Sequence, residues 1–226
     1  MAHPQPAKNS LGLLLRRLLS YFSLDWDAAL LDLVHGLRRM WTHGRQEGMY
    51  EILDYDTTLE LLDPKGERAV FYKRQRVKFL QDNILAFQDY SWGEGNIFAA
   101  YRCSPGVVVD RYQEGDRWNI VISLRASKSR GDIEEFSIER RVKGGFTQAV
   151  EWRQVEIRHR TRHLRLAVVF PKARPCRQAQ LIQRSRHRVL PLGPEHLHAL
   201  PDGRQRLAWE TKNIQPLEIY TVKWWW

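Results

Sequence analysis

The hydrophobic pattern of the chain changes its period at Gly48, and this change constrains the fold more than any other feature. Before Gly48, apolar residues recur every three or four positions, as they do on one face of a helix. After it, short runs of alternating apolar and polar residues are separated by turn signals such as Asp63-Pro64-Lys65-Gly66. The sequence therefore predicts a mainly β protein with an N-terminal helical arm or hairpin.

Many short strands separated by turns, without a convincing helix pattern, are typical of a β-sandwich. We expect an antiparallel β-sandwich-like domain over residues 48–226. The clearest strand runs from Trp118 to Leu124, and the run from Leu164 to Phe170 is similar, so the apolar residues of both should be buried. At the end of the chain, alternation places Trp224 and Trp226 on one face, and we expect that face to be in the core.

Residues 1–9 contain two prolines and no apolar periodicity, which predicts a flexible tail. Residues 10–47 are predicted to form a helical arm that begins at a Ser10 N-cap. The apolar seam of this arm has three interpretations: packing on the chain's own β domain, self-association, or contact with a membrane surface. The candidate oligomerisation residues are Leu11, Leu15, Leu18, Phe22, Trp26, Leu30, Leu33 and Leu37.

A basic block extends from Arg153 to Arg188 and contains a single acid, Glu156. Its excess of positive charge equals that of the whole chain, +10, so the excess is local. Alternation predicts that 150–160 and 162–170 form a hairpin with arginines at its turn. Guanidinium groups bind phosphate and carboxylate in a bidentate manner, so this hairpin is a candidate anion site. Its candidate residues are Arg158, Arg160, Arg162, Arg165, Lys172, Arg174 and Arg177.

An acidic strand precedes this block, and Glu135 and Glu139 on it could neutralise part of the basic charge across a sheet. Cys103 and Cys176 have no neighbouring Cys or His at zinc spacing, so we expect two free thiols and no metal or cofactor. The apolar run near the N-terminus is interrupted by Arg16 and Arg17, which disfavours a secretory signal or a spanning helix. These features lead us to expect a cytoplasmic protein.

Three functions remain open, because no motif in the sequence identifies a reaction. The first is a non-enzymatic binding or adaptor module that contacts a protein partner through its Arg-rich face and helical arm. The second is a protein that binds nucleic acid without sequence preference, or an acidic lipid surface. The third is an enzyme whose site no motif identifies. We expect the first of these.

Overall fold

The computed structural model describes residues 48–226, and this part of the chain is built from strands. The expected mainly β class is confirmed. The strands are β1 (Tyr50–Leu61), β2 (Arg68–Phe79), β3 (Ile84–Ser91), β4 (Asn96–Ser104), β5 (Val107–Glu114), β6 (Arg117–Lys128), β7 (Ile133–Lys143), β8 (Val150–Glu156), β9 (Leu164–Phe170), β10 (Gln178–Gln183), β11 (Arg188–Pro191), β12 (Leu197–Ala199), β13 (Gln205–Thr211) and β14 (Ile219–Trp225). One 3-10 turn, η1 (Pro194–His196), precedes β12.

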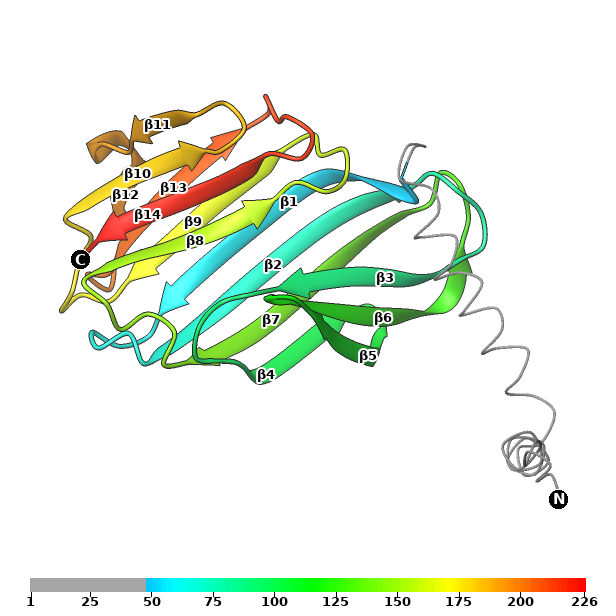
Figure 1. Ribbon diagram of the computed structural model, residues 1–226, viewed down its shortest axis with the longest axis horizontal. Helices are drawn as coiled ribbons and strands as arrows, with labels where there is room; N and C mark the ends of the chain where they lie inside the picture. Colours follow the sequence, from blue (N-terminus) through cyan, green and yellow to red (C-terminus); the bar gives the residue numbers. More distant parts are fainter. Residues whose placement is uncertain (1–47) are drawn as a thin grey trace, which may run out of the picture. The chain divides into compact units, whose positions relative to one another are not determined.

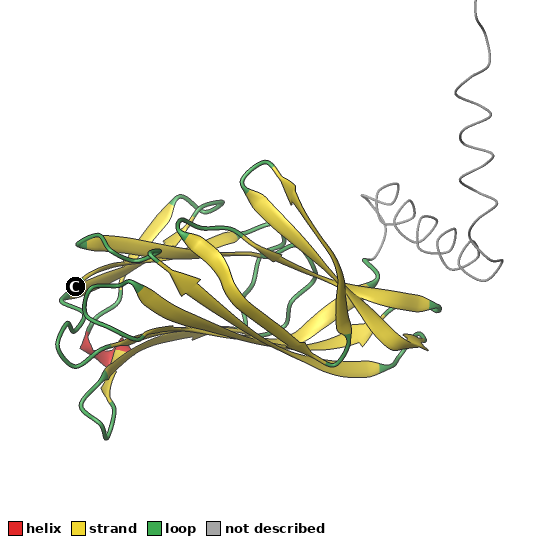
Figure 2. Cartoon of the chain, turned by 90° about the horizontal axis from the view of Figure 1, so that it is seen from below, coloured by secondary structure: helices red, strands yellow, loops and turns green. Residues whose placement is uncertain are grey.

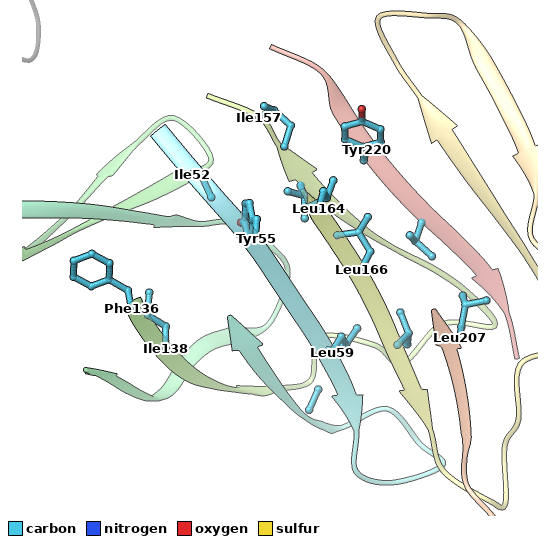
Figure 3. Packing of buried hydrophobic residues seen from close by; sticks show 14 of the residues in the cluster. Ile52, Tyr55, Leu59, Phe136, Ile138, Ile157, Leu164, Leu166, Leu207 and Tyr220 are labelled. Atoms are coloured by element: carbon cyan, nitrogen blue, oxygen red, sulfur yellow. The ribbon is translucent and has the colours of Figure 1, made fainter. Parts of the chain in front are cut away.

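The strands form three sheets that lie in two layers (Figure 1, Figure 2). One layer is a seven-stranded sheet of order β12-β13-β9-β1-β2-β7-β4. The other layer consists of a four-stranded sheet, β11-β10-β14-β8, and a three-stranded sheet, β3-β6-β5, which lie side by side over one face of the first. Apolar residues from all three sheets form one buried cluster. Figure 3 shows the part of this core along β1 and β9, where Leu59, Leu164 and Leu166 lie on the same side.

The β1–β2 hairpin forms at the turn that the sequence predicted. The Asp63 carboxylate accepts hydrogen bonds from the backbone N–H of Lys65 at 2.9 Å and of Arg68 at 2.8 Å. Gly66 has a φ of 73°, and a Cβ at this position would lie 1.6 Å from the carbonyl oxygen of Phe146. A side chain is therefore excluded here on two grounds, conformation and space.

The predicted hairpin of residues 150–160 and 162–170 is wrong. β8 pairs with β14 in the four-stranded sheet, whereas β9 pairs with β1 and β13 in the large sheet. Each strand buries its apolar face against the opposite layer, so the segment between them crosses from one layer to the other. The expectation that Glu135 and Glu139 neutralise the basic block is also wrong, because β1 and β2 lie between their strand and β9.

The predicted core residues of β6 and β9 are buried, with the exception of Trp118, which is partly exposed. Trp224 and Trp226 are also buried, as expected. The predicted tail, the helical arm and its seam from Leu11 to Leu37 lie outside the described residues. Within residues 48–226, no helix is long and apolar enough to cross a membrane. Cys103 and Cys176 are free thiols.

Candidate anion-binding cavity

A cavity of about 170 Å³ lies between the two layers, below the seam where the two smaller sheets meet. β8 is the last strand of the four-stranded sheet and β3 is the first strand of the three-stranded sheet, so a sheet edge borders the seam on each side. β1, β2 and β7 of the large sheet provide the floor of the cavity. β3, β8 and the loops that follow β3 and β7 provide the walls.

Two arginines of the cavity are buried, Arg140 on β7 and Arg153 on β8, with 8% and 5% of their surface exposed. Arg153 donates hydrogen bonds from Nη1 to the carbonyl oxygen of Ala167 at 3.0 Å and from Nη2 to Oγ1 of Thr57 at 2.6 Å. Its Nε is buried and has no hydrogen-bond partner. Arg140 donates from Nη1 to the carbonyl oxygen of Ile97 at 3.1 Å. Within residues 48–226, neither guanidinium group has a carboxylate within 4.0 Å.

Phe71 on the cavity floor contacts both arginines. The guanidinium carbon of Arg140 lies 4.2 Å from the centre of the Phe71 ring, and that of Arg153 lies 5.3 Å from it. A ring face attracts a cation but does not neutralise its charge. Burial lowers the pKa of both arginines to about 10, because a low dielectric disfavours the charged form. Both remain protonated at neutral pH, so the cavity contains two buried cations without a direct ion pair, although the carboxylates of Asp89, Glu94 and Glu151 also line it.

A third cation of the cavity is neutralised. Nζ of Lys73 lies 2.5 Å from Oδ1 of Asp89, and the Tyr101 hydroxyl donates to Oδ2 of Asp89 at 2.8 Å. Burial and the Asp89 carboxylate raise the pKa of Tyr101 well above its usual value. Asp89 is therefore held by two donors and balances Lys73, whereas Arg140 and Arg153 form no direct ion pair with a carboxylate of residues 48–226.

Side chains close the seam at one end. At the closed end, the Tyr90 hydroxyl donates to the carbonyl oxygen of Glu156 at 2.5 Å, and Arg117 forms an ion pair with the Glu156 carboxylate at 2.9 Å. Trp92 stacks on Tyr90, and Trp152 on β8 is 45% exposed; both tryptophans also line the cavity. Glu151 also lines the cavity, and burial raises the pKa of its carboxyl.

The predicted anion-site residues are divided between the two ends of β9. Arg158, Arg160 and Arg162 lie in the crossing segment before β9, and Lys172, Arg174 and Arg177 follow its other end. A seven-residue strand spans roughly 20 Å, so the two groups do not form one patch.

Most of these arginines have an acidic neighbour. Arg158 lies 3.7 Å from Glu156, and Arg160 and Arg162 lie 3.9 Å and 2.7 Å from Glu51. Arg165 contacts Asp56 at 2.8 Å and Glu210 at 3.2 Å. Arg174 instead lies over the Trp226 ring at 3.9 Å. An anion site at these residues remains a prediction.

The alternation of apolar residues in the sequence places both cavity arginines on the buried face of their strands, although the charge pattern does not indicate this. Arg140 has the same parity as Ile138 and Val142, which are buried on the inner face of β7. Arg153 likewise alternates in step with Val155 on β8. An arginine on the apolar face of a strand is expected either to be paired or to have a function. The surrounding basic residues of the Arg153–Arg188 block made Arg153 look like part of a solvated face.

His159 in the crossing segment is the basis of a prediction about pH. Its ring lies 4.2 Å from that of Tyr50, and burial, with a smaller effect of Arg158, lowers its pKa to about 4. Below pH 6.5 the unfolded chain therefore takes up a proton that the folded protein does not, and stability falls as the pH drops from 6.5 to 4. We expect His159 to lower the free energy of unfolding by about 3 kcal/mol at pH 4. Urea unfolding of the native protein and of His159→Phe, each at pH 7.5 and pH 4, measures this loss of stability. Equal losses in both proteins would contradict the assignment.

Comparison with known proteins gives no family. No family model matches the sequence, and no curated protein matches it. Among solved structures, the chain is similar to an M1 zinc metallopeptidase from Deinococcus radiodurans, with a TM-score of 0.47 and 10% identity over 76% of this chain and 42% of that chain. It is also similar to a putative protease from Parabacteroides distasonis, with a TM-score of 0.47 and 8% identity over 80% of this chain and 41% of that chain. The chain thus spans about two fifths of their length, and similarity at this level carries no argument about function.

Proposed function

We propose that residues 48–226 form a non-enzymatic binding module, a β-sandwich-like domain whose ligand is an anionic group held in the cavity. One observation carries the proposal: Arg140 and Arg153 are buried around Phe71 without a carboxylate within 4.0 Å. A buried charge that lacks a partner costs several kcal/mol. An anion that occupies the cavity would offset that cost, and the planar fork of a guanidinium group suits a carboxylate or phosphate.

Except for Glu151, whose carboxyl has a raised pKa, the charged groups of the cavity favour binding over proton transfer. Arg140 and Arg153 stay protonated at neutral pH, so they cannot accept a proton. The Asp89 carboxylate already accepts hydrogen bonds from Lys73 and Tyr101. The volume of about 170 Å³ is close to that of a cavity of about 150 Å³ that holds benzene. The site therefore suits an anionic group with an apolar part no larger than a ring.

Titration with benzoate and with inorganic phosphate tests the proposal, by calorimetry and by the fluorescence of Trp92 and Trp152 at the cavity. We expect one benzoate to bind per chain. Benzoate at one hundred times its Kd should then stabilise the fold by about 2.7 kcal/mol. Arg153→Met should weaken binding at least tenfold, because it removes the charge and keeps much of the volume. The proposal is wrong if neither anion binds, or if Arg153→Met binds benzoate as tightly as the native protein does.

Two control proteins separate the cavity from other basic surfaces. Arg206→Met removes an exposed arginine of β13 and should leave the Kd for benzoate unchanged. A triple change of Arg158, Arg160 and Arg162 to Glu tests the proposed polyanion surface, whose Arg160 and Arg162 are mostly exposed. Loss of retention on heparin in this protein, with unchanged benzoate binding, would show two separate anion sites. Loss of benzoate binding with an intact fold would place the benzoate site at these three arginines instead.

A further inference from the structure

The layer that contains the cavity mouth has a gap between two strand edges. β8 and β3 border the seam, and neither is paired on that side with a strand of residues 48–226. A tyrosine side chain, rather than backbone hydrogen bonds, joins the two edges at Glu156. The strands are therefore further apart there than the roughly 4.8 Å between paired neighbours.

The backbone groups that β8 presents to the seam can be identified from its contacts with β14 and the residues beside it. The N–H of Ile157 donates to the carbonyl oxygen of Glu218 at 2.9 Å, and the carbonyl oxygen of Ala149 accepts from the N–H of Trp226 at 3.3 Å. Because backbone groups alternate in direction along a strand, the even-numbered residues between them face the seam. The hydrogen bond from Tyr90 to the carbonyl oxygen of Glu156 agrees with this. The backbone groups of Val150, Trp152 and Gln154 therefore form an open edge beside the cavity.

A strand added to this edge would direct every second side chain towards the large sheet, and so towards the cavity. The cavity there contains Arg140 on its floor and Arg153 on its wall, and its volume suits one side chain. On the outer side, the exposed Trp152 and Val150 would lie beside the added strand and favour apolar or β-branched neighbours.

Resting on the proposed function, we infer that the anion is the side-chain carboxylate of an extended peptide from a partner protein. The peptide adds a strand to β8, and one Asp or Glu side chain enters the cavity between Arg140 and Arg153. Main-chain hydrogen bonds would provide affinity, as in other cases of strand addition, and the inward carboxylate would provide specificity. The occupant of the site is then an acidic segment of protein rather than a free metabolite.

The experiment uses the full chain and a labelled, end-blocked seven-residue peptide of Val and Thr with Glu at its centre. We expect binding by fluorescence anisotropy, and at least tenfold weaker binding when the central Glu is replaced by Gln. In the protein, Gln154→Pro removes one edge N–H, which proline can do without disturbing a strand whose N–H faces outward. This change should weaken peptide binding at least tenfold and leave the Kd for benzoate within twofold of the native value. Gln154→Ala keeps the N–H and should bind the peptide as the native protein does.

Each outcome separates the inference from the function on which it rests. If benzoate binds and the peptide does not, the inference is wrong and the cavity binds free small anions. If Gln154→Pro binds the peptide as well as Gln154→Ala does, the peptide does not pair with β8 and the inference is wrong. If Gln154→Pro fails to fold, N-methylation of the peptide at successive residues replaces it. Methyl groups at alternate positions should then weaken binding, and equal effects at all positions would overturn the inference.

Discussion

Leu166→Asp is expected to leave residues 48–226 without a stable fold at 25 °C. Leu166 lies on β9 with 2% of its surface exposed, between Thr57 of β1 and Trp209 of β13 (Figure 3). Removing a core leucine costs about 2 to 5 kcal/mol, and a carboxylate without a partner in the core adds a further cost. The sum is comparable to the whole stability of a domain, about 5 to 15 kcal/mol. Loss of the near-ultraviolet circular dichroism signal, together with the urea transition, would show the unfolding.

Leu217→Asp is the matched control, because it introduces the same side chain where no core exists. Leu217 is 72% exposed and has a φ of 60°, a conformation that Asp adopts more readily than Leu. The free energy of unfolding of the Leu217→Asp protein should stay within about 0.5 kcal/mol of the native value. A folded Leu166→Asp protein, with a transition near that of the control, would mean that β9 is not in the centre of the core.

Arg140→Met is expected to make the ligand-free protein more stable, by about 1 to 2 kcal/mol. Burial that lowers the pKa of an arginine from 12.5 to about 10 corresponds to about 3 kcal/mol at neutral pH. The change also relieves the repulsion between Arg140 and Arg153. Against this stand the lost hydrogen bond to Ile97, worth about 1 kcal/mol, and a weaker contact with Phe71. Urea unfolding without ligand should show a higher midpoint and an unchanged slope.

Arg140 is expected to serve the ligand and not the fold. The same protein should therefore bind benzoate at least tenfold more weakly than the native protein does. Arg102→Met, on the neighbouring strand β4, removes an exposed arginine and should change neither quantity. If Arg140→Met loses more than about 1 kcal/mol of stability, Arg140 is a structural residue and the cavity has one binding cation fewer.

Local patterns in the sequence were sufficient for the class of fold and for several of its parts. The turn at Asp63-Pro64-Lys65-Gly66 follows from local chemistry, since its hydrogen bonds lie within six residues. The burial of Trp224 follows from alternation alone. Strand partners are a different matter, because the pairing of β9 with β1 joins segments more than one hundred residues apart and leaves no local signal. For this reason local alternation predicts a hairpin of β8 and β9, which are adjacent in sequence but lie in different layers.

The candidate site was hidden for a related reason. A charge pattern shows where arginines are concentrated in the sequence. It does not show which of them are buried, because burial depends on which face of a strand meets the other layer. Arg153 belongs to the basic block by composition and to the core by parity, and only the arrangement of the layers distinguishes the two. The open edge of β8 depends on the order of strands in its sheet, which a single sequence does not contain.

The parallel pairing of β1 with β9 also determines how long one edge of β1 stays unpaired while the chain is being synthesised. The β1–β2 hairpin can form early, but the other edge of β1 has no partner until β9 emerges, more than one hundred residues later. At roughly 5 to 20 residues per second, that interval lasts about 5 to 20 s.

An open edge next to apolar side chains invites pairing between nascent chains. The outer face of β1 contains three acids, Asp54, Asp56 and Glu60, which form ion pairs with arginines in the finished sheet. Arg74 and Arg76 of β2 already pair with Asp56 and Asp54 within the hairpin, whereas Arg165 of β9 and Arg204, just before β13, arrive later. Until Arg204 arrives, the Glu60 carboxylate lacks its ion-pair partner and repels its counterpart on a second copy of β1.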